Sequence, residues 1–124
     1  MKLRLRENSI RLRLLQSEIK QLKENGFVTE KIQFAPSQIL TYTINFSTDA
    51  NEISAHFQVG EILISIPQDI AEQWVNTNQV GLETEQIIDN EKNLKILIEK
   101  DFVCVDRPMD KDNLDAFPHP KMNC

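Results

Sequence analysis

The fold is decided by residues 8–28, NSIRLRLLQSEIKQLKENGFV, because the same pattern returns at residues 60–80, GEILISIPQDIAEQWVNTNQV. When the first stretch is moved along by 52 positions, apolar residues fall on apolar residues and a helix-starting residue falls on another. The coincident pairs are Ile10 and Ile62, Leu12 and Ile64, Leu14 and Ile66, Gln16 and Gln68, Ser17 and Asp69, Gln21 and Gln73, Leu22 and Trp74, and Val28 and Val80. The chain is therefore predicted to contain one unit twice, although strand and helix periodicities alone can also produce such a likeness.

The first copy is predicted to be two strands, a helix and two strands. Its opening residues alternate strictly between apolar and basic types, which indicates a half-buried strand pair that turns at Glu7 and Asn8. Ser17 is a plausible helix N-cap, and Gly26 suits the position just after a helix C-terminus. The predicted elements are strands at 2–6 and 9–14, a helix at 16–25, and strands at 27–34 and 39–47.

The second copy repeats this order after a short connection. A turn near Gly60 separates its first two strands, and Asp69 with Glu72 resembles a capping box at the start of the helix. Leu40 to Ile44 match Leu94 to Ile98 at a shift of 54, so the copies differ by a small insertion. The predicted elements are strands at 53–57 and 61–66, a helix at 68–76, and strands at 80–88 and 93–99.

The predicted fold class is α+β: a duplicated ββαββ unit that forms an antiparallel β-sandwich or barrel with two short helices and an irregular C-terminal tail. A chain of 124 residues is one domain by size. Within residues 1–124, the first pseudo-repeat is expected at about 1–47, the second at about 53–100 and the tail at 101–124. Closure of the strands into a barrel would remove the exposed edges that invite aggregation.

Charge limits the classes of partner. The net charge of −5 argues against a general nucleic-acid binder, which would carry an excess of Lys and Arg. No stretch is apolar for the length of a membrane span, and the alternating N-terminus is not a signal peptide, so we expect a cytoplasmic protein without membrane contact. Residues 1–13 are basic and residues 99–115 are acidic. These opposite charges could attract each other within one chain or between copies, which makes self-association an expectation.

The sequence resembles an uncharacterised family of small bacterial proteins that carries only a domain-of-unknown-function label. The resemblance rests on Met1 to Arg6, Asn8 to Leu14 and Glu99 to Phe102, and on Cys104, Asp115 to Pro118 and Cys124. It covers nearly the whole chain and implies a soluble bacterial protein. It implies no activity, and the family pattern often has Asn where His119 stands here.

The tail is one candidate for chemistry because it gathers thiols, carboxylates and an imidazole. These groups are competent ligands for zinc or a similar divalent ion, but their spacing matches no established metal motif. The proposed metal ligands are Cys104, Asp106, His119 and Cys124, with Asp110, Asp112 and Asp115 nearby. The alternatives are a solvated acidic turn and a redox pair of Cys104 with Cys124.

The basic face of the N-terminal strand pair is the second candidate. Guanidinium groups grip phosphate and carboxylate through paired hydrogen bonds, so this face is predicted to bind anions. Its residues are Lys2, Arg4, Arg6, Arg11 and Arg13. If the face pointed into a closed barrel, the result would be similar to the triphosphate-tunnel enzymes, with metal-binding acids from Glu83, Glu85 or Glu99. Those enzymes open with Glu-x-Glu-x-Lys, which this chain lacks, and the alternative is an outward, solvated face.

The function predicted first is a non-enzymatic binding or interaction module for a partner or a small anionic ligand. The alternative is a tunnel-barrel phosphohydrolase-like enzyme or binder that acts on anionic phosphorylated ligands, and a metal-binding tail comes third. Familiar catalytic groupings are absent from the sequence, so no catalytic residue is assigned and no cofactor is identified. His56 is expected at the surface and Trp74 in the core.

Overall fold

The computed structural model describes residues 1–102 and 114–117. Eight strands and two helices follow one another in the predicted order in this part of the chain. The strands are β1 (Lys2–Arg6), β2 (Ser9–Leu14), β3 (Phe27–Ala35), β4 (Gln38–Ser47), β5 (Ser54–Gln58), β6 (Glu61–Pro67), β7 (Gly81–Ile87) and β8 (Asn93–Lys100). The helices are α1 (Gln16–Asn25) and α2 (Gln68–Asn76). The α+β expectation is confirmed.

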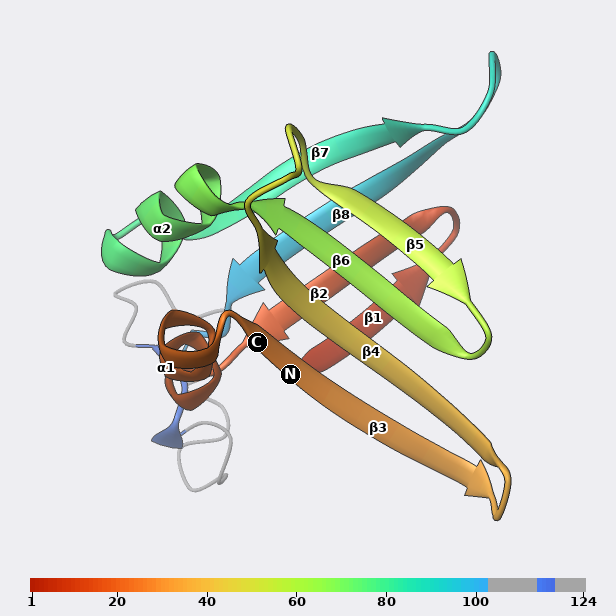
Figure 1. Ribbon diagram of the computed structural model, residues 1–124, viewed down its shortest axis with the longest axis horizontal. Coiled ribbons are helices and arrows are strands. Elements are labelled where there is room, and N and C mark those ends of the chain that lie inside the picture. Colours follow the sequence, from red (N-terminus) through yellow and green to blue (C-terminus); the bar gives the residue numbers. More distant parts are fainter. Residues whose placement is uncertain (103–113, 118–124) are drawn as a thin grey trace. The chain divides into compact units, whose positions relative to one another are not determined.

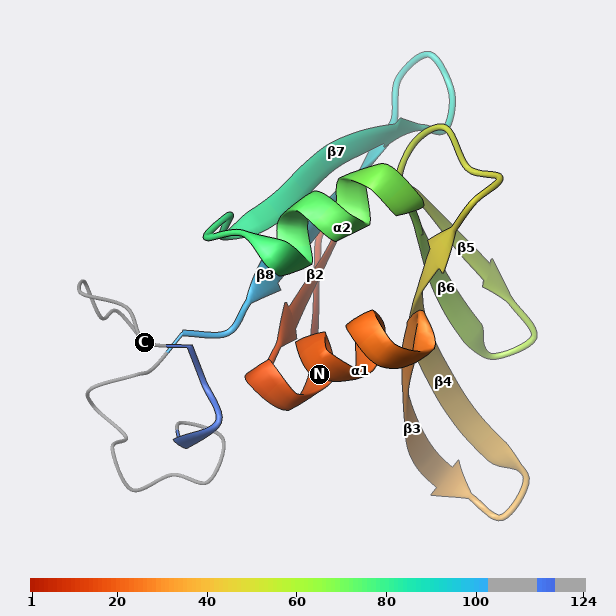
Figure 2. The same cartoon turned by 60° about the vertical axis from the view of Figure 1, so that its left-hand side comes forward.

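The strands form two four-stranded sheets, which we name sheet A and sheet B. Sheet A has the order β1-β2-β8-β7, and in Figure 1 its red and blue strands lie side by side although they come from opposite ends of the sequence. Sheet B has the order β3-β4-β6-β5, and Figure 2 shows its two hairpins next to each other. Each sheet keeps two edge strands among the described residues, so these strands do not close into the barrel that was one of the two expected arrangements.

The sheets also differ from the expected antiparallel arrangement in one respect. Each is built from two antiparallel hairpins whose inner strands run parallel, β2 beside β8 in sheet A and β4 beside β6 in sheet B. The hairpins themselves are antiparallel because a short turn can only reverse the chain. The β2–β8 pair joins hairpins that are distant in the sequence, and β4 and β6 are separated by β5, so local pattern could not reveal the direction of either pair.

The chain divides into two compact units, within each of which the residues mainly contact one another, and these units do not coincide with the two pseudo-repeats. One unit contains Met1–Lys20 and the described residues from Val80 onward, and it holds sheet A. The other contains Gln21–Gln79, and it holds sheet B. Each sheet thus takes one hairpin from the first ββαββ stretch and one from the second.

The two sheets repeat each other in detail. Leu12 lies opposite Ile98 in sheet A, and the matching residues Ile64 and Ile44 lie opposite each other in sheet B. The amide of Lys95 donates to the carbonyl of Asn8, as Thr41 does to Gly60, and Lys100 donates to Val80, as Phe46 does to Gly26. The turn residues Glu7 and Val59 both have positive φ, 52° and 47°. Residues of the β1–β2 hairpin therefore match residues of the β5–β6 hairpin 52 positions later, and residues of the β3–β4 hairpin match residues of the β7–β8 hairpin 54 positions later.

This correspondence corrects one alignment made from sequence. Val28 was set on Val80, but the residue that occupies its place in sheet A is Leu82. Val28 lies opposite Ile44, and Leu82 lies opposite Ile98. Val28 and Leu82 are both buried, whereas Val80 is 45% exposed. α2 is one residue shorter than α1, and its connection to the next strand is three residues longer, which together account for the two-residue difference.

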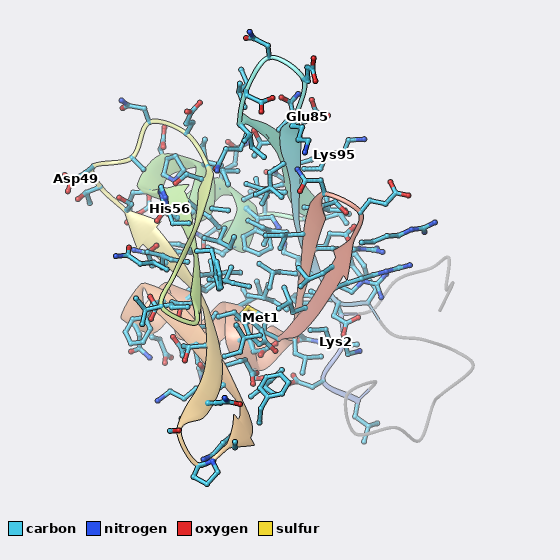
Figure 3. The ribbon with its side chains drawn as sticks, turned by 90° about the vertical axis from the view of Figure 1, so that its right-hand side faces the viewer. Met1, Lys2, Asp49, His56, Glu85 and Lys95 are labelled. Atoms are coloured by element: carbon cyan, nitrogen blue, oxygen red, sulfur yellow. The ribbon has the colours of Figure 1, made fainter. Side chains whose placement is uncertain are left out.

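Each sheet buries one face, as the period-two patterns require. In sheet A the buried side chains include Leu12, Leu14, Ile96 and Ile98, and in sheet B they include Ile44, Ile64 and Ile66. Leu22 of α1 and Trp74 of α2 are 0% exposed, and α2 contacts β6 and β4. Trp74 is therefore in the core, and His56, labelled in Figure 3, is exposed; both predictions are confirmed. Neither described helix has the length and apolar content to cross a membrane.

The helix caps differ from those predicted. α1 begins at Gln16, so Ser17 lies inside its first turn and is not the N-cap. The cap comes from the C-terminal part of the chain, because the Asp115 carboxylate accepts from the Ser17 amide at 3.3 Å and from the Ser17 hydroxyl at 2.6 Å. Glu18 accepts from the Leu15 amide at 2.8 Å and pairs with the amino group of Met1. In α2, Asp69 and Glu72 form no capping box, since Pro67 precedes the helix without a side-chain cap.

Candidate functional site

The five predicted anion-binding residues lie together on one face of sheet A, which we call the charged face. Strand alternation puts the apolar residues of β1 and β2 on the opposite face. Because the four strands are in register, side chains on the charged face form three rows across the sheet. The rows are Lys2, Arg13, Glu99 and Gly81; then Arg4, Arg11, Leu97 and Glu83; then Arg6, Ser9, Lys95 and Glu85.

Positive charge predominates on this face although the whole chain is acidic. The rows hold six cations and three carboxylates, whereas the net charge of the chain is −5. The cations belong mainly to β1 and β2, and the carboxylates belong to β7 and β8. The charged face is therefore basic at the β1 edge and acidic at the β7 edge.

Some of these cations are neutralised within the sheet. Nε of Arg11 lies 2.5 Å from Oε1 of Glu99, and Nε of Arg13 lies 3.8 Å from the same oxygen. Nζ of Lys2 lies 2.8 Å from Oδ2 of Asp101. The predicted attraction between the basic start and the acidic later part of the chain is confirmed for these pairs.

Arg4, Arg6 and Lys95 have no such partner among the described residues. Arg4 and Arg6 are exposed on β1, and Lys95 is exposed on β8. Figure 3 labels Lys95 beside Glu85 at one end of the sheet and Lys2 toward the other end. No ion pair of 4.0 Å or less joins Arg4, Arg6 or Lys95 to a described carboxylate.

The three uncompensated cations border one hollow on the charged face. Its volume is about 260 Å³, and all four strands of sheet A line it. The lining residues are Arg4, Arg6, Ser9, Ile10, Arg11, Glu83, Lys95, Ile96 and Leu97. A smaller hollow of about 180 Å³ lies next to it and is lined by Lys2, Leu3, Arg4, Arg11 and Arg13. Together the two hollows include every residue predicted to bind anions.

Sequence reasoning missed Lys95, Ser9 and Leu97 as members of this site, and it named Glu83 only as a metal ligand of the tunnel alternative. The alternation of residues 93–99 already placed Lys95 on a polar face, but nothing local indicated that β8 would lie beside β2. Ser9 donates its hydroxyl to the carbonyl of Arg6 at 2.6 Å and so helps to hold the turn at the end of the site.

The geometry does not favour a phosphate tunnel. The basic side chains are on a solvent-accessible face of sheet A. The described strands of this sheet do not close into a barrel, so these side chains do not line a tunnel. In the described ranges, no three His, Cys, Asp or Glu side chains come together in a group that could hold a metal ion. The tail ligands Cys104, Asp106, His119 and Cys124, and also Asp110 and Asp112, lie outside the described residues, whereas Asp115 caps α1.

Comparison with known proteins adds the family but no activity. No curated protein and no solved structure shows significant similarity to the chain. A family model matches residues 1–121, which is nearly the whole length and agrees with the resemblance noted from the sequence. The chain belongs to a family of unknown function, DUF7009.

Proposed function

We propose that the protein is a non-enzymatic binding module of the bacterial cytoplasm, and that the charged face of sheet A is its binding surface for a small anionic ligand. The observation that carries this proposal is the convergence of Arg4, Arg6 and Lys95 on one hollow, without a carboxylate partner in the described part of the chain. Glu83 also lines the hollow and Glu85 lies next to Lys95, but neither forms an ion pair within 4.0 Å, so the three exposed cations are available to an external anion.

The chemistry of these residues favours a phosphorylated or carboxylated ligand. A guanidinium group can donate two parallel hydrogen bonds to either anion, and such charge-assisted bonds are about twice as strong as neutral ones. Ser9 and Arg11, which also line the hollow, add a hydroxyl and a third guanidinium. The hollow is open, so binding there does not require the ligand to be enclosed.

Sheet B supplies an internal comparison. The positions in sheet B that match Arg4, Arg6 and Lys95 are His56, Gln58 and Thr41. The buried faces of the two sheets are alike, whereas this exposed face is charged in one sheet and largely neutral in the other. The charge is therefore not needed to form a sheet of this topology, which supports a binding role for it.

The test is a calorimetric titration of the full chain with inorganic pyrophosphate. We expect the double variant Arg4→Gln/Arg6→Gln to bind about a hundredfold more weakly or worse, since each lost charge-assisted bond contributes about 1.5–3 kcal/mol. The matched control is Lys23→Gln/Lys31→Gln, which removes the same charge from two exposed lysines elsewhere. Absence of binding by the wild type, or an equal loss in the control, would overturn the proposal.

A second measurement separates binding from catalysis. Incubation with pyrophosphate or inorganic triphosphate and Mg²⁺ or Mn²⁺ is expected to release no phosphate. Release that depends on Arg4 and Arg6 would replace the binding module with the phosphohydrolase alternative.

We also infer that the two ββαββ stretches descend from one duplicated unit. Support comes from the matched strand registers, the matched backbone hydrogen bonds and the positive φ of Glu7 and Val59. Periodicity alone would produce similar elements, but it would not produce the same inter-strand bonds at the same shifts. Since each sheet needs a hairpin from both copies, a single ancestral unit would have needed a second chain to complete its sheets.

A further inference from the structure

The two edge strands of sheet A run in the same direction. β1 is antiparallel to β2, β2 is parallel to β8, and β8 is antiparallel to β7, so β7 points the same way as β1. An edge strand carries a row of backbone donors and acceptors that another strand can use. A second copy of sheet A could therefore continue the first, with its β1 parallel to β7 and the same face outward.

The side chains at these two edges are complementary in charge and in position. On the charged face, β1 presents Lys2, Arg4 and Arg6, and β7 presents Gly81, Glu83 and Glu85. Arg4 shares a row with Glu83, and Arg6 shares a row with Glu85. A copy that continues the sheet in register would place its Arg4 beside Glu83 and its Arg6 beside Glu85.

We propose that the β1 edge of one copy binds the β7 edge of a second copy, through parallel strand addition with Arg4 facing Glu83 and Arg6 facing Glu85. The occupant of the basic edge is thus a second copy of this chain. This inference uses the basic residues of the proposed function but does not depend on it, because the ligand here is the carboxylate pair of another copy.

Charge also disfavours the symmetric alternatives. Pairing β1 with β1 would bring arginines together, and pairing β7 with β7 would bring glutamates together, which opposes both arrangements. In the described part of the chain, neither Glu83 nor Glu85 has an ion-pair partner within 4.0 Å, and Oε2 of Glu85 accepts a hydrogen bond from the Asn93 side-chain amide at 3.3 Å, so both carboxylates can still pair with a cation. The favoured contact joins two different surfaces, and such contacts produce rings or open filaments.

Sheet B lacks this complementarity at the corresponding edges. Its edge strand β5 presents Ser54, His56 and Gln58 on the matching face, and its edge strand β3 presents Phe27, Thr29 and Lys31. No pair of acids faces a pair of bases there. The opposite charges belong to the edges of sheet A and are not a general property of edge strands in this chain.

The experiment reverses the charges of the β1 edge in one variant and those of the β7 edge in another. The mass of each protein in solution is measured by analytical ultracentrifugation at low ionic strength. The wild type is expected to form species larger than the monomer as its concentration rises and to lose them in high salt. The variants Arg4→Glu/Arg6→Glu and Glu83→Arg/Glu85→Arg are each expected to be monomeric, because each has two like-charged edges. Equimolar mixing should restore the larger species, since the acidic edges of one variant then meet the basic edges of the other.

A variant with all four charges reversed should assemble alone, which separates loss of charge complementarity from misfolding. The control Glu52→Arg/Glu91→Arg reverses two exposed acids elsewhere and should assemble like the wild type. A wild type that stays monomeric, or a mixture that stays monomeric, would overturn the proposal. If the wild type is monomeric and binds pyrophosphate, this inference is wrong and the proposed function stands. If the wild type assembles and binds no pyrophosphate, the proposed function is wrong and this inference stands.

Discussion

Oε1 of Glu99 lies 2.5 Å from Nε of Arg11 across the parallel pair of β2 and β8. The two residues come from opposite ends of the described chain, and the same oxygen lies 3.8 Å from Nε of Arg13. Glu99 therefore reduces the positive charge of the candidate site from within, while Arg4, Arg6 and Lys95 remain uncompensated among the described residues.

Glu99→Gln is expected to strengthen anion binding. The substitution removes the carboxylate that competes with an external anion for Arg11 and Arg13, so we expect pyrophosphate affinity to rise about threefold to tenfold. The cost in stability should be small, about 1 kcal/mol or less, because the pair is partly exposed. Calorimetric titration beside Glu91→Gln, which removes an exposed charge from a loop, tests this. Weaker binding by Glu99→Gln than by the control would contradict the site.

Leu12→Ala and Ile64→Ala should destabilise the protein to a similar degree. Leu12 and Ile64 occupy matching places in the parallel pairs of the two sheets, and each is 1% exposed. Removing a large buried aliphatic side chain costs about 2–5 kcal/mol. Urea unfolding followed by circular dichroism and by the fluorescence of Trp74 measures both. A loss below about 1 kcal/mol at either position would contradict the matched core.

Asp115→Ala should weaken the start of α1 although Asp115 is distant from it in sequence. The carboxylate accepts hydrogen bonds from the amide and hydroxyl of Ser17, and a negative charge at a helix N-terminus is favourable. The expected loss is about 0.5–2 kcal/mol. Ser17→Ala should remove part of the same energy, so the double variant should lose less than the sum. Asp49→Ala, in an exposed bend, is the control, and additive losses would argue against the contact.

Two glycines are expected to respond differently to alanine. Gly26 has φ of 82° but nothing within 4 Å of an added Cβ, so Gly26→Ala should cost only backbone strain, about 1–2 kcal/mol. At Gly81 an added Cβ would lie 2.7 Å from the carbonyl oxygen of Ile98, which is backbone and cannot move aside easily. Gly81→Ala should therefore be the more damaging substitution in thermal unfolding. The opposite order would show that β7 and β8 can separate at this end.

Part of the candidate site was predictable because alternation is a local property. The sequence Lys-Leu-Arg-Leu-Arg at residues 2–6 puts its basic residues on one side of any strand it forms, and the structure has them there. The contribution of Lys95 was not predictable, and Glu83 was named only for the tunnel alternative, since both positions depend on which strands become neighbours. The same limit applies to the cap on α1, where a local candidate, Ser17, was replaced by Asp115.

The secondary structure was predictable from local pattern: both helices have the predicted bounds, 16–25 and 68–76, and each strand begins and ends within one residue of its predicted bounds. Side-chain spacing of two or about three and a half residues, turn residues and short-range sterics act within a few residues, so a linear pattern records them. The pairing of β2 with β8 and of β4 with β6 depends on the packing of the whole chain. The β2–β8 pairing places the basic residues of β1 and β2 beside the acids of β7 and β8 on one face. Backbone hydrogen bonds between strands are alike for all residues, so the choice of partner depends on how whole hairpins bury their apolar faces, which no short segment encodes.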